Sequence, residues 1–189
     1  YIAAMRIILF DIDGTLIRSG GAGRTAMLRA LAGEYGIGTP ETDVPFSGRT
    51  DRAIIADLLE ALQLDDSSSG WLRVRDRYLK ELPQALVECG GEVLPGIADG
   101  LNHLRDCERT HLGLLTGNVR AGAELKLTHY GLWDYFAFGG FCDGETHRDD
   151  VARAAYRAAC AHAGGDLPAE PVWVIGDSPH DVTCARAIG

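Results

Sequence analysis

Short apolar runs recur along the chain and predict the strands of a buried sheet. They cover residues 5–10, 111–116, 135–138 and 171–176. The runs are almost continuously apolar, which is typical of parallel strands covered on both faces. The first run ends in acidic residues and a glycine, which indicates that the strand stops there.

Amphipathic stretches with helical spacing lie between these runs. They cover residues 97–107, 120–130 and 150–163. The first of them places Ile97, Leu101 and Leu104 on one helical face. Strands that alternate with helices predict βαβ units. The expected fold class is therefore α/β, with a doubly wound, Rossmann-like parallel sheet.

Residues 18–93 interrupt this alternation with three helical stretches and no convincing strand. The stretches are residues 24–35, 50–62 and 71–89. Glycines within 20–23 and at 90–91 flank the region, and such junctions are suited to hinges. We therefore expect a small, mobile, all-helical cap domain at 18–93, inserted into a core domain made of 1–17 and 94–189.

The composition fits one domain, or one core with a modest insert. The chain has 189 residues, of which 46% are hydrophobic and 24% charged, enough for a sizeable core. No apolar run approaches the ~18–20 residues that span a bilayer, and the N-terminus is too short for a secretory signal. A cytoplasmic protein with no membrane partner is therefore expected.

The two ends of the sequence carry expectations of their own. Tyr1 is not a natural initiator, so residues 1–4 are expected to be added or upstream sequence. Residues 181–189 begin a helix with nothing after it, so a final strand and helix are expected to be missing.

Charge and cysteine content narrow the function. The formal net charge is −9, which disfavours nucleic acid as a partner. Phosphorylated small molecules remain compatible, because a metal ion and a few cations can reverse the field in one pocket. The five cysteines have no CxxC spacing, which favours reduced thiols over disulfides or a zinc site.

The first candidate for chemistry follows the first predicted strand, where Asp11 and Asp13 precede Gly14. Ligands of open α/β sheets bind at the carboxyl ends of strands. Two carboxylates this close repel each other unless a cation lies between them, and hard oxygen ligands suit magnesium. The alternative is a solvated acidic turn or a helix cap.

Residues suited to binding an anion or a cation follow two further predicted strands. Thr116, Gly117 and Asn118 follow the second predicted strand, where a hydroxyl and main-chain N–H groups form an anion site or simply turn the chain. Asp177 ends the last strand and Asp181 follows one helical turn later; alternatively, Asp177 is a helix cap. Carboxyl ends of parallel strands meet at one edge, so we expect these side chains to converge.

These motifs resemble those of the haloacid dehalogenase superfamily of phosphohydrolases, over nearly the whole chain. The resemblance consists of a strand followed by DxDGT, a helical cap, a threonine at the second strand end and GDxxxD at the last. It is strongest for the small-capped, phosphoglycolate-phosphatase-like branch. The implied fold is a Rossmann-like core with a small helical cap.

The resemblance implies a role for each aspartate. Asp11 would be the nucleophile that forms an aspartyl-phosphate, and Asp13 the general acid and then the general base. The implied cofactor, Mg²⁺, would be held by Asp11, the Asp13 carbonyl and Asp177. Asp181 would belong to the metal site by orienting its water shell or a basic neighbour.

Substrate binding is implied for two segments. Thr116 would hold a phosphoryl oxygen, helped by the amides of Gly117 and Asn118. Arg49, in a segment whose position resembles the family's specificity loop, would meet a second anionic group or lie exposed at a helix start. Trp71, Tyr78 and Leu82 are expected in the core of the cap.

The third family motif is where the chain departs from the pattern. The family usually has a lysine before the helix that leads to the last catalytic strand, and Arg148 is the one fixed cation there. Arginine stays charged and pairs bidentately with phosphate, so Arg148 is the expected replacement. Lys126 is the fallback, but its mid-helix position predicts a surface residue.

The expected function is that of a magnesium-dependent phosphatase acting on a small phosphorylated metabolite. Asp13 favours phosphate esters, because relatives that cleave carbon–halogen or carbon–phosphorus bonds differ at this position. The alternatives are a phosphomutase of the β-phosphoglucomutase type and a non-catalytic binding protein with the same fold. The sequence leaves the substrate and the oligomeric state open.

Overall fold

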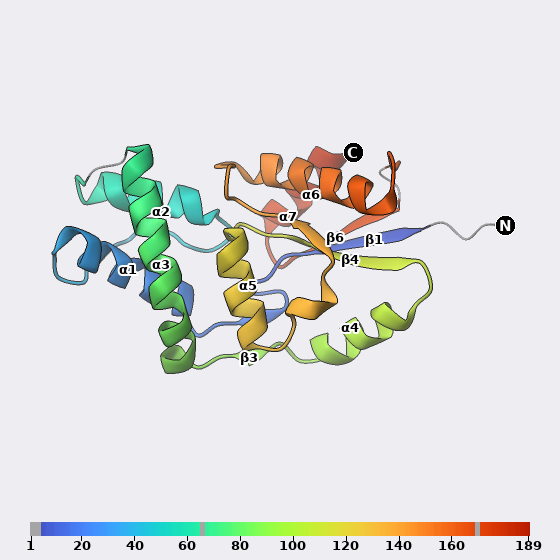
Figure 1. Cartoon of the computed structure of the whole chain (residues 1–189), viewed down its shortest axis with the longest axis horizontal. Coiled ribbons are helices and arrows are strands. Elements are labelled where there is room, and N and C mark those ends of the chain that lie inside the picture. Colours follow the sequence, from blue (N-terminus) through green and yellow to red (C-terminus); the bar gives the residue numbers. More distant parts are fainter. Residues whose placement is uncertain (1–4, 65–66, 169–170) are drawn as a thin grey trace.

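A parallel sheet with the strand order β5-β4-β1-β6 forms the centre of the molecule. The computed structural model describes residues 5–64, 67–168 and 171–189. The strands are β1 (Arg6–Phe10), β4 (Thr110–Leu115), β5 (Phe138–Gly140) and β6 (Val172–Ile175). Helices α6 (Arg148–Ala163) and α7 (Pro179–Ile188) cover one face, and α4 (Ile97–Asp106) and α5 (Arg120–His129) the other (Figure 1). The predicted doubly wound α/β fold is confirmed.

The strands are largely apolar because most of the sheet is covered on both faces, but Trp173 and Ile175 of β6 are exposed. In β1, Ile7 and Leu9 pack into the hydrophobic cluster that includes α6, whereas Phe10 packs into the cluster that includes α4 and α5. Phe10 pairs with Leu114 of β4 on one side and with Ile175 of β6 on the other. This register brings the carboxyl ends of all three strands to one edge.

The predicted strand at 135–138 is wrong in its bounds. Trp133–Tyr135 form a short 3-10 helix, η1, and β5 begins only at Phe138. The strand ends in two glycines, which give no apolar signal. A Cβ atom at Gly140 would lie 2.4 Å from the main-chain oxygen of Val151, so this strand needs bare backbone where α6 crosses it.

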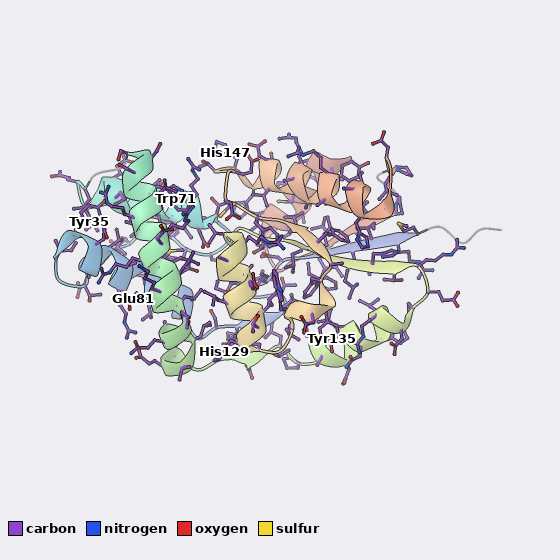
Figure 2. The ribbon with its side chains drawn as sticks, in the orientation of Figure 1. Tyr35, Trp71, Glu81, His129, Tyr135 and His147 are labelled. Carbon is purple, nitrogen blue, oxygen red and sulfur yellow. The ribbon has the colours of Figure 1, made fainter. Side chains whose placement is uncertain are left out.

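Three helices lie beyond the carboxyl edge of the sheet, on the left of Figure 1. They are α1 (Ala22–Tyr35), α2 (Asp51–Ala61) and α3 (Ser68–Cys89), which we call the helical unit. Trp71, Tyr78 and Leu82 of α3 are buried as expected, and Figure 2 shows Trp71 near the place where α2 and α3 meet. The three predicted helices are confirmed.

Two short strands join the helical unit to the sheet. Strands β2 (Ile17–Arg18) and β3 (Glu92–Val93) pair in antiparallel fashion, and Arg18 Nη1 lies 3.0 Å from Glu92 Oε1. No strand was expected in 18–93, because two-residue strands are too short to show alternation. The two chain crossings therefore lie side by side, while the division into cap and core domains stays a prediction.

Expectations about membrane helices, cysteines and the N-terminus can also be compared with the structure. None of the helices in the described ranges is long and apolar enough to cross a membrane. All five cysteines are free thiols. Residues 1–4, expected to be added or upstream sequence, lie outside the described residues.

Candidate active site

A cavity of about 580 Å³ lies between the carboxyl edge of the sheet and helices α1 and α2. The predicted site residues in its walls are Asp11, Asp13, Arg49, Gly117, Asn118, Arg148 and Asp177. Thr116 and Asp181 are not among the described residues that line it, and both are buried. The structure thus gathers the predicted residues around one cavity, with two of them behind its surface.

An acidic cluster forms where β1 and β6 end. Asp11, Asp177 and Asp181 each offer a carboxylate oxygen, and these oxygens lie within 4.8 Å of one another. Hard oxygen ligands at this spacing fit Mg²⁺. The Asp13 carboxylate is not part of the cluster, which leaves only its main-chain carbonyl for the implied metal contact.

Gly14 allows the loop after β1 to approach the end of β6. Its φ angle is +88°, which favours glycine, and a Cβ atom there would lie 2.3 Å from Oδ2 of Asp177. The neighbouring Thr15 hydroxyl donates to Asp177 Oδ1 at 3.5 Å. The glycine of the first motif therefore makes room for a carboxylate that comes from the last motif.

Ser178 and Arg148 hold Asp181 in place. Its Oδ2 accepts hydrogen bonds from the amide and hydroxyl of Ser178, the N-cap of α7, at 3.0 and 2.7 Å. Its Oδ1 accepts a hydrogen bond from Arg148. The alternative that Asp177 caps this helix is wrong, because Ser178 has that position.

Arg148 begins α6 and turns its charge toward the acidic cluster. Its side chain is only 9% exposed, and Nη2 lies 3.8 Å from Asp11 Oδ2. Its buried Nε has no hydrogen-bond partner among the described residues. A guanidinium in the cavity wall suits a phosphoryl oxygen, although the catalytic role of Arg148 stays a prediction.

The protein alone compensates the charge of Asp11 poorly. Burial raises the pKa of this carboxyl group to about 7, although the charge of Arg148 opposes the rise. The carboxylates of Asp181 and Asp13 raise the pKa further. A divalent cation beside Asp11 would favour its ionised form, so the charge balance as well as the oxygen ligands fits a cation.

The structure corrects the expectation that Lys126 lies on the surface. The side chain is buried, and Nζ donates to Asp13 Oδ2 at 2.6 Å and to Asn118 Oδ1 at 2.7 Å. The amide nitrogen of Asn118 also donates to Asp13 Oδ2, at 3.0 Å. The buried face of α5 consists of Gly122, Ala123, Lys126 and Leu127. The lysine therefore points inward on the same face as the apolar residues Ala123 and Leu127.

These contacts set the charge of Asp13. Burial by itself would raise the pKa of Asp13, but the Lys126 ammonium, with hydrogen bonds from Asn118 and Ser19, holds this pKa below its usual value. Asp13 is therefore a carboxylate in the free protein. Its side chain remains 41% exposed, so it can still exchange a proton with a ligand in the cavity.

The loop after β4 has residues both in the cavity wall and in the interior. The Thr116 hydroxyl is fully buried and accepts hydrogen bonds from the side-chain and main-chain nitrogens of Asn118, at 2.8 and 3.3 Å. Gly117 and Asn118 line the cavity. The structure thus shows Thr116 supporting Asn118 from behind, and its contact with a phosphoryl oxygen stays a prediction.

Arg49 lines the cavity, but its charge has a partner. Nη2 lies 2.7 Å from Asp57 Oδ2, and Nη1 donates to the Pro45 carbonyl at 3.3 Å. A Cβ atom at Gly117 would lie 2.3 Å from the main-chain oxygen of Arg49. The segment before α2 is thus in close contact with the loop after β4, and Arg49 is neither exposed nor free.

Asp51, which the sequence analysis did not single out, links α2 to the core. Its buried carboxylate accepts a hydrogen bond from the Val119 N–H at 2.9 Å, and its own N–H donates to the Gly117 carbonyl at 2.7 Å. The Thr50 hydroxyl donates to the Thr146 carbonyl at 2.8 Å. The Thr50–Asp51 pair is typical of a helix start, which explains why sequence alone did not indicate a partner outside the helix.

The raised pKa of Asp51 predicts that the stability of the fold depends on pH. Burial, opposed by the charge of Lys126, raises the pKa of Asp51 from 3.8 to about 6. The folded protein then binds this proton more tightly than the unfolded chain, so stability is lost as pH rises through this range. Asp51→Asn keeps an acceptor for Val119, so its stability relative to wild type should rise by up to about 3 kcal/mol from about pH 4 to about pH 7.

Urea unfolding of both proteins at the two pH values measures this effect. Asp99→Asn, at an exposed position of α4, is the control for loss of a surface carboxylate. A stability difference between Asp51→Asn and wild type that does not change with pH would contradict the prediction.

The chain matches known proteins over most of its length. Residues 5–189 match the family of haloacid dehalogenase-like hydrolases. A phosphoglycolate phosphatase from Cereibacter sphaeroides is 30% identical over 188 residues, which cover 96% of this chain and 81% of that protein. The crystal structure of CbbY from Rhodobacter sphaeroides in complex with phosphate has a TM-score of 0.74 at 19% identity, covering 98% of this chain and 84% of that one. A haloacid dehalogenase-like hydrolase from Streptococcus pneumoniae has a TM-score of 0.66 at 22% identity, with 98% and 81% covered.

The chain therefore belongs to the haloacid dehalogenase-like hydrolase family. The chain is therefore a hydrolase by family, and the relative that matches it over 96% of this chain is named a phosphatase. The resemblance inferred from the motifs is thereby confirmed.

Proposed function

We propose that this protein is a magnesium-dependent phosphatase that hydrolyses a small phosphorylated metabolite through an aspartyl-phosphate. The observation that carries the proposal is the surroundings of Asp11. Its carboxylate lies in the wall of a cavity of about 580 Å³, beside two further carboxylates and within 3.8 Å of the Arg148 guanidinium. This arrangement suits attack on a phosphate ester.

In the proposed reaction, Asp11 is the nucleophile and Asp13 transfers the protons. An oxygen of Asp11 attacks phosphorus, the ester P–O bond breaks, and Asp13 protonates the leaving oxygen. Asp13 then removes a proton from the water that attacks the aspartyl-phosphate, which releases inorganic phosphate and restores Asp11. When bound, Mg²⁺ would offset the repulsion between carboxylate and phosphate; Asp11, Asp177 and the Asp13 carbonyl would hold it.

The charge state of Asp13 fits this cycle. Lys126 keeps Asp13 ionised in the free protein, which is the form the second step needs. A phosphate dianion bound beside Asp13 would raise its pKa by charge repulsion. Substrate binding would therefore favour the protonated form that the first step needs.

The relatives support a small substrate. One of them is named a phosphoglycolate phosphatase, and CbbY has been solved in complex with xylulose-(1,5)bisphosphate. We infer that 2-phosphoglycolate and small sugar phosphates are the first substrates to try. In this proposal residues 18–93 form a mobile cap over the cavity, and the enzyme works in the cytoplasm.

Measurement of phosphate release over a substrate panel tests the proposal. The panel contains 2-phosphoglycolate, sugar phosphates, nucleotides and amino-acid phosphates, each with Mg²⁺ and with excess EDTA. We expect phosphate release from at least one substrate and its loss in EDTA. An isomeric sugar phosphate without free phosphate would indicate a phosphomutase. Absence of turnover across the panel, despite Mg²⁺ binding, would indicate a binding protein.

A further inference from the structure

The cavity is lined by helical residues as well as by the acidic cluster at the sheet edge. Its volume of about 580 Å³ is in the range of pockets that enclose whole small ligands. Part of its lining comes from α1, α2 and the segment before α2. The side chains there are those of Arg24, Met27, Phe46, Arg49 and Ile54. This part of the cavity wall therefore combines apolar side chains with two arginines.

Arg24 is held in place without being neutralised. Its guanidinium stacks on the ring of Phe46, with Cζ 4.8 Å from the ring centroid, and Nη2 donates to the Thr42 carbonyl at 2.8 Å. Arginine carries five N–H donors, and no carboxylate in the described part of the chain pairs with this one. A guanidinium fixed by stacking and one hydrogen bond is preorganised for a planar anion.

The other arginines that line the cavity are already paired. Arg18 lies 3.0 Å from a carboxylate oxygen of Glu92, and Arg49 lies 2.7 Å from one of Asp57. Arg148 contacts Asp181 within the acidic cluster. Among the arginines in the described lining, Arg24 is thus the one without a carboxylate partner.

We propose that Arg24, which lines the same cavity as Asp11, binds a second anionic group of the substrate. The substrate is then a phosphomonoester that also carries a carboxylate or a second phosphate. A chain with a formal net charge of −9 repels such a ligand in general, so a local cation is needed to favour it. This inference rests on the proposed phosphatase function, and it replaces Arg49 by Arg24 as the residue that recognises the second anion.

A matched set of substrates tests the proposal. The carboxylate probe is 2-phosphoglycolate, the bisphosphate probe is a pentulose 1,5-bisphosphate, and the neutral probe is 2-hydroxyethyl phosphate, which resembles phosphoglycolate without its carboxylate. Losing one hydrogen bond to a charged group costs about tenfold or more in affinity. In Arg24→Gln, kcat/KM for the preferred anionic probe should therefore fall about tenfold more than for the neutral probe.

Arg29→Gln is the matched control. Arg29 lies on the same helix but pairs with Glu88 on the surface, with Nη2 2.6 Å from Oε2, and it does not line the cavity. The ratio between anionic and neutral probes should stay at the wild-type value in this variant. Equal losses on all probes in Arg24→Gln, or an unchanged ratio, would overturn the assignment to Arg24.

A binding measurement separates this inference from the phosphatase proposal. Calorimetric Kd values are compared in an Asp11→Asn background, with and without Arg24→Gln, for 2-phosphoglycolate, the bisphosphate and 2-hydroxyethyl phosphate. Selective loss of affinity for an anionic probe supports the role of Arg24 even if no turnover is found. Normal turnover by the wild type with no selective loss in either assay would overturn this inference and leave the phosphatase function standing.

Discussion

Asp11→Asn is expected to lower kcat for phosphate release by at least ~10³-fold, because the variant lacks the nucleophile on which both steps depend. The same change is expected to stabilise the fold above about pH 7 in EDTA. Burial raises the pKa of Asp11 to about 7, so its ionised form costs folding free energy that the neutral amide does not. Phosphate-release kinetics and thermal unfolding in EDTA measure the two effects.

A fall in kcat together with a rise in the unfolding temperature distinguishes a catalytic residue from a structural one. Loss of activity through misfolding would lower the unfolding temperature together with kcat. Asp99→Asn, far from the cavity on α4, controls for removal of a carboxylate. Magnesium-dependent turnover near the wild-type rate in Asp11→Asn would show that another group attacks phosphorus.

Lys126→Met is expected to lower kcat by about 100-fold, with a smaller change in KM. The substitution removes the ammonium that contacts both Asp13 and Asn118. The pKa of Asp13 should then rise, because burial is no longer opposed by that charge, and the carboxylate loses its fixed orientation. The acid limb of the kcat profile should accordingly move to higher pH.

The chain offers a matched control, since its two lysines are Lys80 and Lys126. Lys80→Met, at an exposed position of α3, should leave both kcat and the pH profile as in the wild type. A folded Lys126→Met variant with wild-type kcat would refute the role of this lysine.

The sheet and the aspartates were predictable because their determinants are local. Continuous apolar runs require two covered faces, and parallel strands end at one edge, so Asp11 and Asp177 had to approach each other. The helix before the strand that carries Asp177 was also predictable, at 150–163, although it begins two residues earlier, at Arg148. Each inference needed only the direction of a strand and the residue that follows it.

Residues that reach the site from helices could not be predicted in the same way. Lys126 points inward because Gly122 and Ala123 set the buried face of α5, and a small shift in helical phase would have placed it in solvent. Asp51 has the pattern of an ordinary helix start, while its partner Val119 is distant in sequence. Side-chain direction across two packed elements depends on tertiary packing, which spacing along the chain does not encode.

The pairing of β2 with β3 restricts how the helical unit can move. A body attached through two adjacent, hydrogen-bonded segments can pivot about a single axis there, whereas translation away from the sheet would have to break the ladder and the Arg18–Glu92 pair. The start of α2 lies far from this axis in Figure 1. In the cap motion that we propose, a pivot would separate Asp51 from Val119 and would also have to break the packing of α3 against α5. In that motion, three hydrogen bonds at about 0.5–1.5 kcal/mol each would help to hold the helical unit against the core.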